Sequence, residues 1–210
     1  MNFKKYLVSA LAACELALAP IASAKAADGS IEAMCGDKQC VQDIKSSGSL
    51  TPTIGIFARE ITTVDYTNQV GNFGLADLTH NVVGGLDAVT EIQYVPNLGA
   101  LPRAGVQYFR SVGDVSVYAL ATSSLTNPVY GEALVNVSYT PALTPDLRLI
   151  LRLEDVTDLS SKGHDFSKQR LRAGVTISDK LQLGAAGDIV EIGNSSKPTY
   201  NLGGFAGLKF

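Results

Sequence analysis

Residues 147–154 read LRLILRLE, and this stretch decides the fold class. Leu occupies every odd position from 147 to 153, whereas Arg148, Arg152 and Glu154 occupy even positions. Successive side chains of a strand point to opposite faces, so this period of two predicts a strand with one apolar face and one charged face. The same alternation recurs in residues 170–177 and 181–189, which predicts further strands of the same kind.

Alternation with a period of two continues from residue 51 to the end of the chain and predicts ten strands. Their predicted ranges are 51–63, 71–82, 86–95, 102–111, 114–123, 131–140, 147–155, 168–177, 180–190 and 199–210. The connections are too short for crossover helices, so neighbouring strands are expected to be antiparallel.

The predicted connections alternate between short and long. The short ones are 84–85, 112–114, 141–146 and 178–180, and the long ones are 65–71, 96–101, 124–130, 156–168 and 191–198. An even number of strands with short turns at one end and long loops at the other is typical of bacterial outer-membrane barrels. Most of the predicted strands also have the 9 to 11 residues, roughly, that a tilted strand needs to cross a bilayer.

We therefore expect an all-β fold, a closed antiparallel up-and-down transmembrane β-barrel over residues 51–210. About ten strands are expected, or eight if the first hairpin stays outside the membrane. Closure is required because an open sheet edge in lipid would leave backbone groups without hydrogen-bond partners. A soluble barrel would place its apolar face inside, and the alternation alone suits either polarity.

The N-terminus has the features of a secretory signal peptide. Residues 1–26 begin with Lys4 and Lys5, continue with an apolar run, and end with small residues. The segment LAAC, ending at Cys14, also resembles a lipoprotein cleavage site, so lipidation of this cysteine is an alternative. Polar residues 27–50 are expected to form a periplasmic segment before the barrel.

Cys35 and Cys40 are the two cysteines that remain after removal of the predicted signal peptide. An even number of cysteines in an oxidising compartment predicts a disulfide, with Gly36 and Asp37 turning the chain between the two. Such a short closed loop is expected to hold a local turn.

The last strand ends in Phe210, and Leu208, Leu202 and Tyr200 share its face. Here the chain resembles the small outer-membrane β-barrel proteins of Gram-negative bacteria, whose last strand ends in an aromatic residue that the barrel-assembly machinery recognises. The resemblance implies a location in the cell outer membrane, with lipid and lipopolysaccharide around the barrel. Phe205 departs from the pattern, because its phase points inward where a small residue is common.

Charged residues collect on the predicted inner face of the barrel. The predicted lumen-lining residues are Arg148, Arg152, Arg170, Arg172, Glu154, Asp188, Glu91 and Arg103. The four arginines of residues 147–155 and 168–177 would form a basic wall in a lumen of net positive charge. Such a wall favours passage of small anionic solutes. Alternatively, arginines and carboxylates pair across the narrow lumen and close it.

Other chemistry has little support in the sequence. His164, Asp165 and Ser167 lie close together, but neighbours on one loop rarely form a catalytic triad, and His80 has no such partners. The aspartates of 155–168 do not have the spacing of a calcium loop. We therefore predict no enzymatic activity, metal or cofactor, and the net charge of −3 argues against a nucleic-acid partner.

Three functions remain open from the sequence. The first is a porin-like passage for small solutes, or a structural barrel, with an arginine-lined lumen. The second is surface adhesion to a host through the loops at 65–71, 124–130 and 156–168. The third is a soluble exported barrel that binds an apolar ligand.

Overall fold

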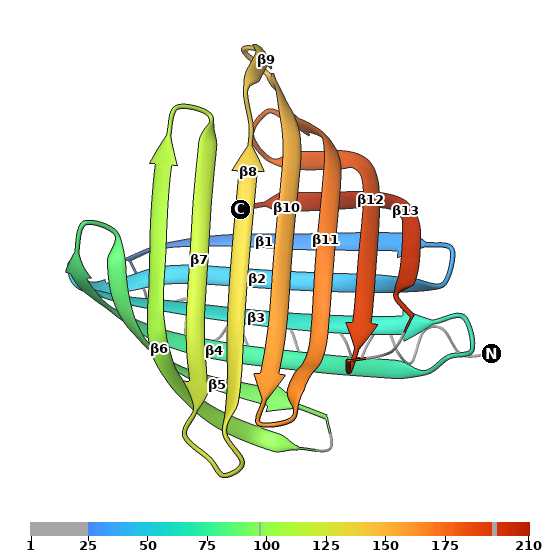
Figure 1. The fold of residues 1–210 in the computed structure, drawn as a ribbon. Helices are drawn as coiled ribbons and strands as arrows, with labels where there is room; N and C mark the ends of the chain where they lie inside the picture. Colours follow the sequence, from blue (N-terminus) through green and yellow to red (C-terminus); the bar gives the residue numbers. More distant parts are fainter. Residues whose placement is uncertain (1–24, 97, 195–196) are drawn as a thin grey trace.

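The computed structural model describes residues 25–210, except 97, 195 and 196, and these residues form strands, turns and irregular segments (Figure 1). The strands are β1 (Lys25–Gly36), β2 (Gln39–Thr51), β3 (Ile54–Asp65), β4 (Val70–Val83), β5 (Leu86–Val95), β6 (Gly99–Val112), β7 (Val115–Ser124), β8 (Tyr130–Tyr139), β9 (Ala142–Thr144), β10 (Leu147–Ser160), β11 (Gly163–Ile177), β12 (Leu181–Ile192) and β13 (Thr199–Lys209). Within the described residues, no helix is long and apolar enough to cross a membrane.

Twelve of these strands form a closed antiparallel barrel. Neighbours along the chain pair with each other, and β13 returns to pair with β1, which closes the ring. The three-residue β9 lies outside this ring and pairs with β10. In Figure 1, β1 to β4 cross steeply behind β7, β8, β10 and β11, as expected for strongly tilted strands. The predicted all-β closed barrel is confirmed.

The predicted number of strands is wrong, because residues 27–50 belong to the barrel. They form most of β1 and β2, which pair with each other and with β13 and β3. These strands were not predicted because Glu32 and Asp43 point into the polar interior, so the sequence of residues 27–50 shows little alternation of apolar and polar residues. The eight-strand alternative and the barrel boundary at residue 51 are also wrong. The signal peptide and Cys14 fall on residues 1–24, outside the described part, and remain predictions.

The predicted long loop at 156–168 is wrong as well. β10 continues to Ser160 and β11 begins at Gly163, so only a two-residue turn joins them. The polar residues of this stretch misled the prediction, yet they pair in register, with Val156 opposite Lys168 and Thr157 opposite Ser167. Residues 66–69 and 125–129 connect the strands at the two other predicted loops. The adhesion hypothesis thus loses the long loop on which it chiefly depended.

The two faces of the barrel have inverted polarity compared with a soluble protein. Outward residues such as Ile92 and Leu153 are 51% and 43% exposed, whereas inward Arg172 and Asp188 are 2% and 1% exposed. An apolar exterior of this kind suits a bilayer. The alternative of a soluble barrel with an apolar cavity is therefore wrong.

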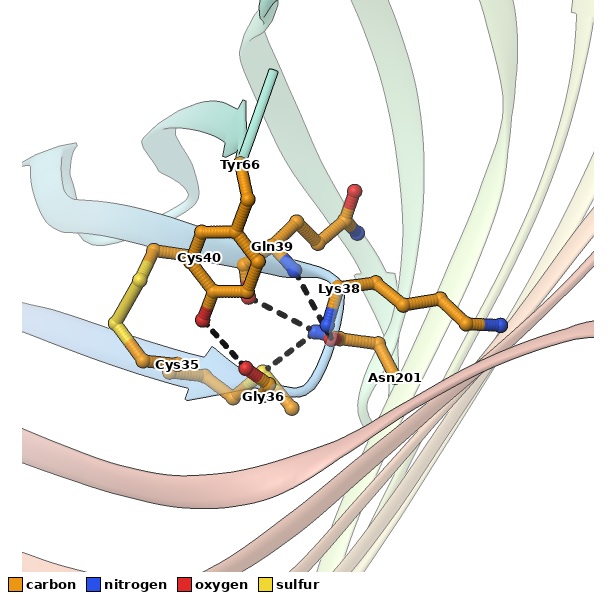
Figure 2. The surroundings of a disulfide bond; sticks show 8 residues. Cys35, Gly36, Lys38, Gln39, Cys40, Tyr66 and Asn201 are labelled. Atoms are coloured by element: carbon orange, nitrogen blue, oxygen red, sulfur yellow. Dashed lines mark hydrogen bonds between the residues drawn. A yellow bond between two sulfur atoms is a disulfide. The ribbon is translucent and has the colours of Figure 1, made fainter. Parts of the chain in front are cut away.

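A disulfide joins Cys35 to Cys40, as predicted, across the turn between β1 and β2 (Figure 2). Asn201 of β13 accepts hydrogen bonds from the backbone N–H groups of Lys38 and Gln39, at 3.0 and 3.2 Å. Phe210 lies at the opposite end of the barrel, where it exchanges backbone hydrogen bonds with Gly29 of β1. The disulfide therefore lies at the other end of the barrel from Phe210, in a turn between two barrel strands and not in a separate segment before the barrel.

Gly203 allows the close approach of β13 to β1 where the barrel closes. A Cβ atom at this position would lie 1.9 Å from the carbonyl oxygen of Cys35 and 2.5 Å from the Cα atom of Gly36. Any larger residue would push these two backbones apart, so the closing ladder depends on the missing side chain.

Gly203→Ala is therefore expected to lower the free energy of unfolding by about 1–3 kcal/mol, the usual cost of overpacking. The measurement is urea-induced unfolding in lipid vesicles, read by heat-modifiable gel mobility. Gly71→Ala is the matched control, since nothing lies within 4 Å of its Cβ position. Equal midpoints for both variants and the parent would contradict this account of closure.

The position of the disulfide predicts labelling from outside the cell, because short turns and chain ends of such barrels face the periplasm. After mild reduction of intact cells, Cys35 and Cys40 should react with a polyethylene-glycol maleimide too large to pass the outer membrane. As control, Asp114→Cys in a background with both cysteines changed to Ser should stay unlabelled, since Asp114 lies in the turn between β6 and β7. The reverse labelling pattern would place the disulfide in the periplasm.

Candidate functional site: the barrel lumen

The lumen receives every second side chain of the tilted strands, and most of its central positions are charged. β1 contributes Glu32, β2 contributes Asp43 and β3 contributes Arg59, all of them buried. Beyond β13 in the ring, β12 contributes Asp188 and β10 contributes Glu154, which are also buried. Because buried charges are costly without partners, the arrangement of these side chains determines whether the barrel is stable.

Arg59 connects two distant parts of the wall. Its Nε and Nη2 atoms donate hydrogen bonds to the two carboxylate oxygens of Asp43, at 3.0 and 2.8 Å. Nη2 also donates to Glu154 Oε1 at 2.6 Å. One guanidinium group thus joins the carboxylates of β2 and β10, which do not pair as strands.

Arg170 and Arg172 of β11 extend this set of ion pairs. Arg170 pairs with Asp43, with Glu154 at 3.2 Å and with Glu32 at 3.4 Å. Arg172 donates to Glu32 at 2.7 Å and to Asp188 at 2.8 Å. Each arginine therefore serves at least two carboxylates.

Three further basic residues complete what we call the ion-pair network. Arg152 pairs with Glu32, Lys168 with Asp188, and Lys45 with Asp43 and Glu154. The full network is Glu32, Asp43, Lys45, Arg59, Arg152, Glu154, Lys168, Arg170, Arg172 and Asp188.

The ion-pair network bridges the lumen at its level. It joins β1, β2 and β3 to β10, β11 and β12 by side chains that cross the interior. Lys45, Arg152, Glu154, Arg170 and Arg172 line a recess among these side chains, which has no room for a water molecule. With its side chains in this arrangement, the recess is therefore closed to a solute.

An apolar cluster lies beside the ion-pair network. Met34, Ile150, Ala186 and Phe205 are buried together inside the barrel. The guanidinium carbon of Arg172 lies 5.9 Å from the centre of the Phe205 ring, within the range of a cation–π contact. The predicted inward phase of Phe205 agrees with its 4% exposure.

A second polar group, which we call the carboxyl cluster, lies on the wall formed by β4 to β8 and β10. Asp77 lies directly opposite Glu91, and Glu132 directly opposite Asp158, in the strand register. Arg103 lies 3.3 Å from Glu91, and Gln93 donates to Glu132 at 2.8 Å. Four carboxyl groups thus share one arginine, although like charges in opposite positions disfavour each other.

The eight residues predicted to line the lumen are placed differently by the structure. The ion-pair network contains five of them, namely Arg152, Arg170, Arg172, Glu154 and Asp188. The Arg152 side chain is 23% exposed. Glu91 and Arg103 belong to the carboxyl cluster. The Arg148 side chain is 39% exposed and bonds to Asp114 and the carbonyl oxygen of Thr140, near the end of the barrel. The four arginines therefore do not form one continuous wall.

The ion-pair network and the carboxyl cluster together contain seven basic and eight acidic side chains, so these two groups do not have the net positive charge predicted for the lumen. Glu32 and Asp43 were missed because their segment was placed outside the barrel, and Asp158 because it was placed in a loop. Asp77 was missed because the face of its strand was ambiguous in the sequence.

The histidine region has a local structural role. His164 Nδ1 lies 2.9 Å from the carbonyl oxygen of Gly193, and Ser160 donates to Asp165 at 2.9 Å. These bonds connect the β10–β11 turn to the segment after β12. Within the described residues, no three His, Cys, Asp or Glu side chains are grouped in a way that could hold a metal ion.

The predicted insertion signal lies on the outer face. Tyr200, Leu202, Leu208 and Phe210 are all about half exposed, at the place where lipid surrounds the barrel. Recognition of this strand by the assembly machinery stays a prediction.

Comparisons with known proteins identify the fold. No protein-family model and no curated protein sequence matches the chain. Among solved structures, the NanC porin superposes with a TM-score of 0.56 at 8% identity, covering 88% of this chain and 99% of that one. The KdgM porin in complex with disordered oligogalacturonate gives 0.52 at 9% identity, covering 87% and 98%. The chain therefore has the fold of the small outer-membrane β-barrel proteins.

Proposed function

We propose that this protein is an outer-membrane channel for small solutes whose lumen is closed at rest by the ion-pair network. The observation that carries the proposal is the set of side-chain bridges across the lumen, such as Arg59 of β3 to Glu154 of β10. The exposed apolar exterior supports placement of the barrel in a membrane, with lipid and lipopolysaccharide around it.

The ion-pair network consists of side chains only, which favours a gate over a permanent plug. Side chains alone make these bridges, so they can rearrange while the backbone ladder of the barrel stays intact. Lys45 and Arg152 are already partly exposed, at 26% and 23% of their side chains, and line the recess. The alternative, a purely structural barrel, has the same contacts but keeps them permanently.

The chemistry of the recess supports acceptance of an anionic group. Four of its five lining residues are basic, namely Lys45, Arg152, Arg170 and Arg172, and Glu154 is the fifth. Arginine and lysine side chains at a narrow point set an electrostatic preference for anions. Small solutes that carry a carboxylate, sulfonate or phosphate group are thus the proposed class.

The last strand is the proposed recognition site of the barrel-assembly machinery. β13 pairs with β1 and closes the barrel, and the ring of Phe210, the next residue after β13, packs at Gly29 of β1. Its exposed apolar residues are available to the barrel-assembly machinery before closure.

The ion-pair network predicts the outcome of conductance measurements in planar bilayers. Arg59→Gln with Glu154→Gln removes the bridge between β3 and β10 and the other ion pairs of these two residues, so the conductance should rise above the low value of the parent. Asp43 keeps Lys45 and Arg170 as partners, which avoids most of the roughly 3–5 kcal/mol that an unpaired buried charge costs. Heat-modifiable gel mobility verifies that the variant is folded.

Asp114→Asn with Arg148→Gln is the matched control, because this pair lies near the end of the barrel and both side chains are well exposed. It should leave the conductance unchanged. If the folded double variant Arg59→Gln, Glu154→Gln conducts no more than the parent, the network is not a gate and the structural barrel is the better description.

A further inference from the structure

Charge is separated across the lumen. The ion-pair network contains six basic and four acidic side chains and lies on β1, β2, β3, β10, β11 and β12. The carboxyl cluster contains four acidic side chains and Arg103 and lies on β4, β5, β6, β8 and β10. One part of the interior is thus formally positive and the other formally negative.

Both parts contain buried polar atoms without a hydrogen-bond partner among the described residues. On the basic side these atoms are Arg170 Nε, Arg172 Nη2 and Asp188 Oδ2, and on the acidic side they are Asp77 Oδ1, Asp158 Oδ1 and both carboxylate oxygens of Glu91. The Glu91 side chain is 0% exposed and that of Arg172 is 1% exposed. Unpartnered buried groups are rare in folded proteins. Unbonded donors occur on the basic side, whereas the unbonded atoms of the acidic side are all acceptors, on carboxyl groups that face one another.

The two parts meet between β3 and β4. Asp77 lies opposite Phe57 in the register, and Arg59 is two residues further along the same inner face. Such diagonal neighbours have Cα atoms roughly 7–8 Å apart. A small molecule at this boundary would be within reach of a guanidinium group and a carboxylate at once.

From this arrangement we infer that the preferred solutes are small zwitterions, with an ammonium group and a carboxylate or sulfonate group. The anionic group would bind to the arginines of the ion-pair network, and the ammonium group to Asp77 and Glu91. The inference rests on the proposed channel function and specifies its substrate class, since a simple anion satisfies the basic side alone.

The test measures the uptake of three labelled solutes of similar size into proteoliposomes that contain the full chain. The solutes are taurine as zwitterion, isethionate as anion and choline as cation, all of which cross lipid slowly. Taurine uptake should exceed both others by about fivefold, the factor expected from one additional screened ion pair. Equal or lower uptake of taurine overturns the inference.

Asp77→Asn with Glu91→Gln should abolish the advantage of taurine over isethionate by removing the acceptors for the ammonium group. These changes also relieve repulsion between two opposed carboxyl groups, so the variant is expected to fold, as gel mobility would verify. Glu60→Gln is the matched control, because Glu60 lies next to Arg59 on β3 and therefore on the outer face. It should keep the taurine preference, and an unchanged preference in the Asp77, Glu91 variant would overturn the inference.

The outcomes separate this inference from the channel proposal. Uptake of all three solutes without a preference for taurine refutes the zwitterion class and leaves the channel intact. Uptake no faster than in empty liposomes for every solute, in the parent and in the Arg59→Gln, Glu154→Gln variant alike, refutes the channel and the inference with it.

Discussion

The structure depends on the closure of the sheet between β1 and β13. A bilayer offers no hydrogen-bond partners, so an open edge would leave a row of backbone N–H and C=O groups unsatisfied. Closure brings the backbone of Gly203 against Cys35 and Gly36, and ends where Gly29 and Phe210 exchange two hydrogen bonds. The tilt and curvature of a ring of twelve strands then define a narrow interior that side chains can fill.

The interior follows from the same constraint, because each strand that presents apolar residues to lipid presents its alternate residues to the lumen. These alternate residues are charged here, and burial forces them to find partners. The arginines of β3 and β11 find carboxylates on β1, β2 and β10, whereas Asp77 and Glu91 face each other. The fold thus pairs one set of charges with opposite charges and places another set of carboxyl groups opposite one another.

Much of the fold could be predicted from the sequence, because strand alternation is a local property. All ten predicted strands exist, and β5 has the bounds that were predicted for it, 86–95. The first two strands were missed because their inward residues include the charged Glu32 and Asp43. Such residues fit a strand only if the interior of the barrel is polar. The pairing of Arg59 with Glu154 was not predictable, since it depends on which residues of distant strands lie at the same height.

The ion-pair network also bears on the order in which the barrel assembles. Asp43 and Glu32 of the first hairpin bond to Arg170 and Arg172, from which they are separated by 127 to 140 residues. The partners of the first hairpin are therefore synthesised near the end of translation. Contacts of such long range slow folding, because a large loop must close before they form. The carboxylates of the first hairpin therefore gain these partners only when the C-terminal strands join the barrel.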